Sequence, residues 1–175
     1  MNINRRAMLF MLAAVMVAAS INFNLAAKPA ALLPVAPVMP QPDISVSGSF
    51  ASKKAQRGRN LQATVVLDIP KGYHVNANRT LSKYLVPTTL KIEVGDKVKV
   101  GSISYPKAIT RTFSFSEEKL AVYEGRAAMR FNLTIPADFP HSKMLVKASV
   151  KYQSCSDSEC YPPVTRAIEM WIDME

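Results

Sequence analysis

The chain has 175 residues, a formal net charge of +9 and only two cysteines. Its basic residues are scattered, apart from a cluster at residues 53–59. Nucleic-acid-binding proteins usually carry a basic face interleaved with aromatic residues, and no such pattern occurs here. We therefore expect no nucleic-acid partner, and at most a mild attraction to anionic membrane surfaces or acidic proteins.

Residues 1–27 have the layout of a secretory signal peptide. Arg5 and Arg6 form a positive start, an uninterrupted apolar stretch covers residues 7–19, and small residues follow. This stretch is shorter than the roughly 20 residues that a transmembrane helix needs. The alternative is an uncleaved anchor that extends through Leu25. In both cases we expect a periplasmic or otherwise extracytoplasmic protein, in contact with the membrane only if the segment is uncleaved.

Residues 28–43 form a proline-rich stretch that holds five of the chain's 12 prolines. Such a density favours extended, polyproline-like backbone over a packed element. We interpret the stretch as a linker, with a propeptide remnant as the alternative. The remaining residues, 44–175, are enough for one domain with its own core.

The domain shows apolar residues at every second position nearly throughout, which is the pattern of half-buried β-strands. Glycine, proline, asparagine and aspartate separate the runs, and no stretch has convincing helical periodicity. Eight strands are predicted, at residues 44–50, 61–69, 88–94, 98–104, 118–123, 127–135, 144–153 and 165–172. Their number and the domain length predict an all-β fold, an immunoglobulin-like antiparallel β-sandwich. The basic cluster at 53–59 lies between two strands and is expected to be a solvated hairpin tip.

Cys155 and Cys160 lie in one short segment, YQSCSDSECYPP, between the last two predicted strands. In the chain-entropy model, a disulfide that closes about six residues contributes roughly 2 kcal/mol, against about 4.7 kcal/mol for a loop of 100. A single disulfide placed for stability would be poorly placed here. The spacing therefore favours a redox-active pair, because two neighbouring thiols can form and resolve a mixed disulfide.

The residues between the two cysteines modify this expectation. Asp157 and Glu159 carry negative charge, which disfavours a thiolate nearby. We therefore expect a pair with no strong intrinsic activation, one that reacts when a partner docks. The alternative is a non-catalytic β-sandwich that binds proteins and whose local disulfide only shapes a loop.

Metal and cofactor chemistry is weakly supported. Zinc sites usually have four ligands, and only His74 and His141 could complete a set with the two cysteines. Nothing in the sequence brings these histidines together, and His74 in a predicted turn is expected to be an ordinary surface residue. We predict no metal and no cofactor.

Residues 152–163 resemble a specific family, the amino-terminal periplasmic domain of the thiol:disulfide interchange protein DsbD. The shared pattern is YQ-x-C, a few polar residues and then CYPP. Residues 71–78 are similar to the family's GWHIN-type segment, and LVPT follows at residues 85–88. Residues 120–125 resemble the tyrosine-containing strand upstream of the cysteines. The resemblance extends over about residues 44–173.

The resemblance implies an immunoglobulin-like fold and a redox role. It implies a thioredoxin-like domain protein or a membrane electron carrier as electron donor, and periplasmic disulfide-containing proteins as acceptors. Cys160 would then form the mixed disulfide and Cys155 would resolve it, giving a protein-disulfide reductase or interchange activity that depends on partners. The resemblance also implies an aromatic cap over the disulfide and a docking surface beside it. Phe115, or else Phe113, is the candidate cap, with plain core packing as the alternative for both. Tyr73 and Tyr161 are the candidates for the docking surface.

The sequence also departs from the family pattern. Better-known members place five residues between the cysteines, whereas this chain has four. The acidic residues that some members carry beside the cap aromatic are not evident around Phe113 and Phe115. Full-length members continue into a membrane domain and a thioredoxin-like domain, and this chain ends at Glu175. The resemblance therefore implies a reductant on a separate polypeptide.

Overall fold

The computed structural model describes residues 41–80 and 82–175. The predicted signal peptide at 1–27, and all but the last three residues of the predicted linker at 28–43, lie outside the described residues. The described ranges contain no helix, and therefore no helix that could cross a membrane.

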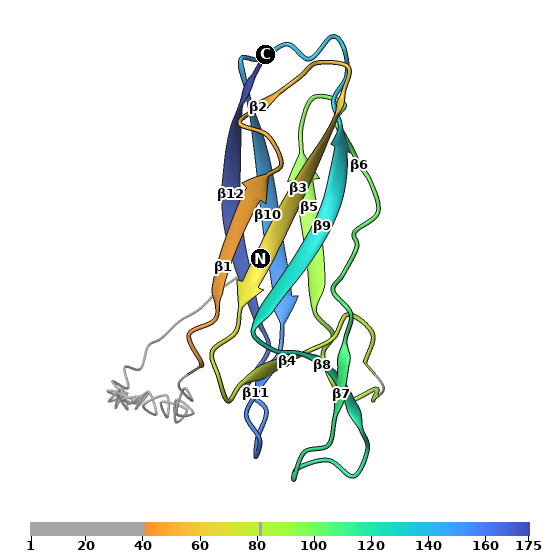
Figure 1. Cartoon of the computed structure of the whole chain (residues 1–175), viewed down its shortest axis with the longest axis vertical. Coiled ribbons are helices and arrows are strands. Elements are labelled where there is room, and N and C mark those ends of the chain that lie inside the picture. Colours follow the sequence, from red (N-terminus) through yellow and green to blue (C-terminus); the bar gives the residue numbers. More distant parts are fainter. Residues whose placement is uncertain (1–40, 81) are drawn as a thin grey trace, which may run out of the picture. The chain divides into compact units, whose positions relative to one another are not determined.

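The described residues form twelve β-strands in three sheets, whose arrangement Figure 1 shows. The strands are β1 (Ser45–Phe50), β2 (Lys54–Ala55), β3 (Asn60–Asp68), β4 (His74–Asn76), β5 (Thr89–Val94), β6 (Lys99–Val100), β7 (Ile109–Arg111), β8 (Leu120–Tyr123), β9 (Arg126–Thr134), β10 (Lys143–Tyr152), β11 (Ser154–Cys155) and β12 (Val164–Met174). The sheet orders are β1-β3-β9-β6, β2-β12-β10-β5 and β11-β4-β8-β7. Every pairing is antiparallel except that of β2 with β12.

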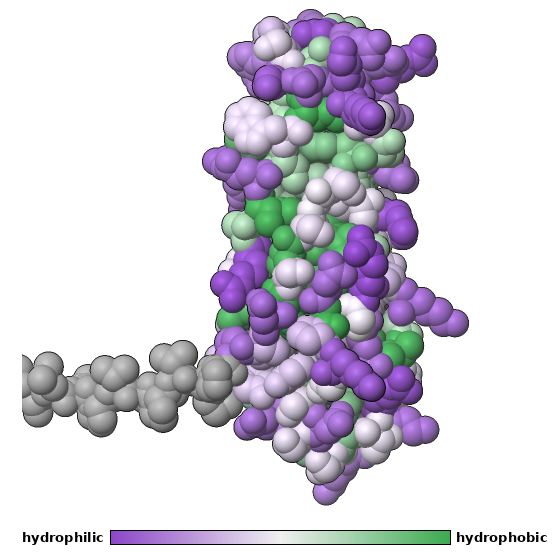
Figure 2. Space-filling view, turned by 60° about the vertical axis from the view of Figure 1, so that its left-hand side comes forward, coloured by the Kyte–Doolittle hydropathy of each residue, from purple (hydrophilic) through white to green (hydrophobic). Residues whose placement is uncertain are grey.

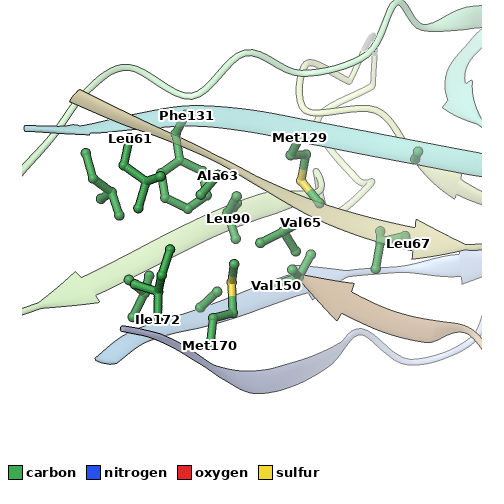
Figure 3. Packing of buried hydrophobic residues seen from close by; sticks show 14 of the residues in the cluster. Leu61, Ala63, Val65, Leu67, Leu90, Met129, Phe131, Val150, Met170 and Ile172 are labelled. Atoms are coloured by element: carbon green, nitrogen blue, oxygen red, sulfur yellow. The ribbon is translucent and has the colours of Figure 1, made fainter. Parts of the chain in front are cut away.

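The first two sheets pack face to face and enclose the hydrophobic core. Alternate residues of β3 and β9 point inward, as the period of two in the sequence requires. Figure 3 shows Leu61, Val65 and Met129 from one sheet opposite Val150 and Ile172 from the other. Each fully buried side chain of this size contributes about 1.5–3 kcal/mol. The immunoglobulin-like β-sandwich expected from the sequence is confirmed.

The side of the sandwich where β1 lies against β12 has half-buried hydrophobic residues between polar ones (Figure 2). Gly48 permits the close approach of the two strands. A Cβ at this position would lie 2.5 Å from the Met170 sulfur and 2.9 Å from Cδ1 of Ile168. Gly48 therefore matters for how tightly this side of the sandwich closes.

The third sheet extends one end of the sandwich and is built from continuations of its longest strands (Figure 1). β10 pairs with β12 over ten residues, up to Tyr152 opposite Val164, and the chain then continues directly into β11. After β3, a turn from Pro70 to Tyr73 leads into β4, with Gly72 at a φ of 87°. This conformation suits glycine in the third position of a type II turn. The two long strand pairs therefore direct β4 and β11 to the same place.

The observed strands differ from the prediction in several places. β2, β4, β7 and β11 were not predicted, and each has only two or three residues. The strand expected at 98–104 shortens to Lys99–Val100 and a single bridge from Ser104 to Arg130. Such strands form because neighbouring elements pair with them, and two or three residues are too few for an alternating pattern to be detected in the sequence.

The basic cluster at residues 53–59 lies in the connection between β1 and β3, but it is not the simple solvated hairpin tip that the sequence predicts. Its Lys54–Ala55 pair adds a parallel strand beside β12. The Arg57 guanidinium donates to the carbonyl oxygens of Phe139 at 2.9 Å, His141 at 2.9 Å and Glu175 at 3.0 Å. The loop is therefore fastened to the rest of the domain, because one arginine satisfies three carbonyls from distant parts of the chain.

Candidate functional site: the Cys155–Cys160 loop

The two cysteines form a disulfide at the end of the third sheet, with their Cα atoms 3.9 Å apart. Cys155, in β11, is fully buried, whereas Cys160 is half-buried. Their backbones pair as an antiparallel bridge, and the Tyr161 amide donates to the Ser154 carbonyl at 2.9 Å. An approaching protein thiol therefore has better access to the Cys160 sulfur than to that of Cys155.

The polar residues between the cysteines close the loop with local hydrogen bonds. The Ser156 amide donates to the Glu159 carbonyl at 2.8 Å, and the Ser156 hydroxyl accepts from the amides of Ser158 and Glu159 at 3.3 and 3.2 Å. Asp157, Ser158 and Glu159 are exposed. The loop is thus held by its own backbone and leaves its charged side chains in solvent.

His74, in β4, lies directly opposite Cys155 in the strand register. Its side chain is 2% exposed, so the expectation of an ordinary surface histidine was wrong. The Phe113 ring stacks on the imidazole with ring centroids 4.0 Å apart and planes 16° apart. Phe115 follows, with its ring centroid 5.4 Å from that of Phe113. Of the two predicted cap residues, Phe113 is therefore the one in direct contact with the histidine beside Cys155.

The loop that carries these phenylalanines, between β7 and β8, also touches the cysteine loop. The Ser114 hydroxyl donates to the carbonyl oxygen of Asp157 at 2.8 Å. Ser114 lies in a turn in which the Ser116 amide donates to the Phe113 carbonyl at 3.2 Å. We call residues 112–116 the aromatic loop. One hydrogen bond and the ring stack with His74 hold it over this end of the third sheet.

Gln153 and Asn76 fix the base of the cysteine loop. Gln153 Oε1 accepts from the Asn76 side-chain amide at 3.1 Å and from the Val86 backbone amide at 3.0 Å. Gln153 Nε2 donates to the Tyr161 carbonyl at 3.2 Å. Asn76 is fully buried and also donates to the Val86 carbonyl at 3.2 Å. One side chain therefore connects β4, the segment before β5 and the residue that follows Cys160.

The two predicted docking tyrosines lie next to each other. Tyr161 is mostly buried and Tyr73 half-buried, with ring centroids 6.2 Å apart. Tyr73 borders a groove of about 560 Å³. The other residues of this groove that carry a charge or can titrate are Lys71, His74, Arg111, Glu124 and Asp157.

The charges in this groove act on His74 in opposite directions. Burial lowers the pKa of the imidazole, while the carboxylates of Glu124 and Asp157 act to raise it. Burial is the larger effect, so His74 is neutral near pH 7. Glu124 also binds the Arg111 guanidinium, with 3.1 Å between Oε1 and Nε. Among the described residues, no group of three or more His, Cys, Asp or Glu side chains could hold a metal ion.

Comparison with protein families gives a match to the model described as "Thiol:disulfide interchange protein DsbD, N-terminal", over residues 41–171. The chain belongs to this family. The match covers the third sheet with its disulfide and the sandwich up to residue 171, within β12. The Cys155–Cys160 pair therefore lies in a domain of a thiol–disulfide exchange family, and a disulfide of this kind fits an oxidising compartment.

Two solved structures are similar to parts of this DsbD-type domain. The N-terminal periplasmic domain of ScsB from Proteus mirabilis is 10% identical with a TM-score of 0.48, and the match covers 77% of this chain and 48% of that one. Spo0M, a sporulation control protein from Bacillus subtilis, is 14% identical with a TM-score of 0.34, over 75% and 49% of the two chains. The chain thus spans about half the length of these structures. No curated protein matches it.

The structure brings the six predicted site residues to the same end of the domain: Cys155, Cys160, Tyr73, Tyr161, Phe113 and Phe115. The sequence did not assign a role to His74, Ser114, Asn76 or Gln153. For His74 the only available signal was its place in the segment that resembles the GWHIN pattern. Ser114 gave no signal, because its partner lies 43 positions further along the chain.

Proposed function

We propose that this DsbD-type domain is an exported thiol:disulfide exchange protein that relays electrons through the Cys155–Cys160 pair. The donor is a thioredoxin-like protein or a membrane electron carrier, and the acceptors are oxidised extracytoplasmic proteins. The observation that carries the proposal is the unequal burial of the two sulfurs, in a domain of a family named for this exchange.

The exchange has two halves. In the first, a donor thiolate attacks the more accessible Cys160 sulfur and the Cys155 sulfur leaves. The second donor thiol then resolves the mixed disulfide, so that the donor is oxidised and the domain holds two thiols. In the second half, the Cys160 thiolate attacks an acceptor disulfide, and Cys155 attacks Cys160 to release the acceptor as a dithiol. Two electrons move in each half.

The aromatic loop acts as a cap in this proposal. Phe113 and Phe115 shield the disulfide end of the domain from small oxidants and reductants, and a docking partner displaces them. Among the described residues, the Phe113–His74 stack and the Ser114–Asp157 hydrogen bond hold the loop closed. Neither is a covalent or buried ionic contact, so opening breaks few interactions. Tyr73 and Tyr161 form the surface that the partner contacts next to Cys160.

The predicted signal peptide supports an extracytoplasmic, periplasmic location for this chemistry. Disulfides form and persist in such compartments. In the cytoplasm the pair would be held reduced, and it could not receive electrons from a donor.

Trapping with single-cysteine variants tests the proposal. A thioredoxin-like protein with only its first active-site cysteine, activated as a mixed disulfide with thionitrobenzoate, is mixed with Cys155→Ser or with Cys160→Ser. The Cys155→Ser variant should form a covalent adduct, visible on a non-reducing gel, because Cys160 attacks and no thiol resolves it. The Cys160→Ser variant should form little or none. Equal adduct from both variants, or none from either, would leave the protein-binding module with a structural disulfide as the better description.

A further inference from the structure

His74 has an unusual combination of burial and missing partners. It is 2% exposed, and its Nε2 atom has no hydrogen-bond partner among the described residues. Buried polar side-chain atoms are nearly always paired, and an exception calls for an explanation such as a redox or catalytic role. The structure holds the disulfide, in which neither sulfur carries a proton. Reduction places an S–H donor on each sulfur, and with it a possible partner for the imidazole.

The strand register brings His74 to the cysteine that most needs such a partner. His74 in β4 pairs directly with Cys155 in β11. Directly opposite residues of an antiparallel pair project to the same face, with Cβ atoms about 4.5–5.5 Å apart. The Phe113 ring covers one face of the imidazole, with the two ring centroids 4.0 Å apart. The imidazole and the Cys155 sulfur therefore share one covered space.

Cys155 cannot readily lose its proton to water. Its side chain is fully buried, and a thiol in apolar surroundings is harder to ionise than a free one. Only the thiolate attacks a disulfide. The half-buried Cys160 can exchange its proton with solvent, but Cys155 requires an acceptor inside the protein.

We propose that His74 accepts the proton of Cys155 when this cysteine resolves a mixed disulfide. This inference rests on the proposed function, in which Cys160 attacks first and Cys155 resolves. It assigns a base to the second step of a reaction that needs one. It also accounts for the burial of a histidine whose Nε2 atom has no partner among the described residues in the oxidised state.

In the resolving step, the Cys155 thiol transfers its proton to Nε2 of His74, and its sulfur attacks the Cys160 sulfur. The Cys155–Cys160 bond forms, the bond between Cys160 and the partner breaks, and the partner leaves as a thiolate. The imidazolium then returns its proton to that thiolate or to solvent. The domain dithiol loses two electrons, and the partner disulfide gains them.

The surrounding charges suit a base that works near neutral pH. The charged groups of the adjoining groove are Lys71 before β4, Arg111 in β7, Glu124 after β8 and Asp157 in the cysteine loop. Burial keeps the imidazole neutral and ready to accept a proton, in agreement with the lowered pKa of His74. Glu124 and Asp157 then stabilise the imidazolium that forms. The ion pair with Arg111 moderates the effect of Glu124.

Stopped-flow reaction of the reduced full chain with one equivalent of dithiobis(nitrobenzoate) separates the two steps. The first thionitrobenzoate is released when Cys160 attacks, and the second when Cys155 resolves. In the wild type, the rate of the second release should be nearly flat from about pH 6.5 to 8, because a neutral histidine removes the proton. In His74→Phe, which keeps an aromatic ring beneath Phe113, that rate should fall at least tenfold at pH 7. It should then rise about tenfold per pH unit across this range, because the thiolate fraction of an unassisted thiol grows tenfold per unit below its pKa.

Two further variants keep the test decisive. His74→Gln supplies a polar side chain that is not a base, and it should show the same steep profile even if His74→Phe fails to fold. His141→Phe alters the other histidine, at a distant site beside Asp96, and should keep the flat profile. A flat profile in both His74 variants would overturn the proposal. So would an equal slowing of the first and second releases, which would indicate a purely structural role.

The reagent is not a protein partner, so this outcome and that of the trapping experiment are independent. If the His74 variants lose the flat pH profile of the second release but the trapping experiment fails, the proton transfer to His74 stands and the relay between proteins is rejected. A flat profile in the variants together with successful trapping would keep the relay and reject the role of His74.

Discussion

Replacing Gln153 with leucine should destabilise the oxidised domain by about 2–3 kcal/mol. The substitution keeps the approximate volume of the side chain and removes three side-chain hydrogen bonds, to Asn76, Val86 and Tyr161. Each such bond contributes about 1 kcal/mol net, and a donor left without a partner adds to the loss. The half-buried position of Gln153 places the total near the sum of the three bonds, because leucine gains little from its own burial there.

Urea denaturation monitored by circular dichroism measures this change in the free energy of unfolding. The matched control is Gln62→Leu in β3, an exposed position whose side chain makes no hydrogen bond with the described residues. The control should change stability by less than about 0.5 kcal/mol. If Gln153→Leu loses less than about 1 kcal/mol, the network does not fasten the cysteine loop to β4.

Three other outcomes are expected. The free energy of unfolding should stay constant above about pH 6.5 and decline as the pH falls below it, by at most about 1.4 kcal/mol per pH unit, because burial lowers the pKa of His74 in the folded state. In urea denaturation at a series of acid pH values, the His74→Gln variant should show a shallower decline. Arg57→Ala should lower the free energy of unfolding, measured in urea, by about 1–3 kcal/mol, because three hydrogen bonds to carbonyls are lost. Arg59→Ala should change it little, because the Arg59 side chain is exposed and makes no hydrogen bond with the described residues. Phe113→Ala should speed reduction of the disulfide by dithiothreitol several-fold, measured by thiol release, and Phe115→Ala should speed it less, because Phe113 stacks more closely on His74. Equal reduction rates in both variants and the wild type would contradict the role of these rings as a cap.

Much of the fold could be predicted because its long strands carry a clear alternation. Leu61, Ala63, Val65 and Leu67 lie at every second position of β3 and all face the core. The disulfide could also be predicted, because Cys155 and Cys160 are the only cysteines of the chain and lie close together in sequence. Local patterns of this kind need no knowledge of distant residues.

The parts that could not be predicted depend on contacts between distant segments. His74 belongs to a three-residue strand whose burial comes from β8, β11 and the aromatic loop, so its own neighbours in sequence give no sign of it. The parallel pairing of Lys54–Ala55 with β12 joins residues that lie far apart along the chain. A cluster of basic residues appears solvated until the carbonyls that bind Arg57 are known.

The reduction potential of the Cys155–Cys160 pair distinguishes a working exchange pair from a structural disulfide. The oxidised protein is equilibrated in glutathione buffers of known ratio, and the reduced fraction is measured by thiol alkylation. A working exchange pair should have a potential less negative than about −300 mV, within reach of thioredoxin-like donors. A potential well below −300 mV, typical of inert structural disulfides, would contradict the account and identify the pair as a structural link in the loop.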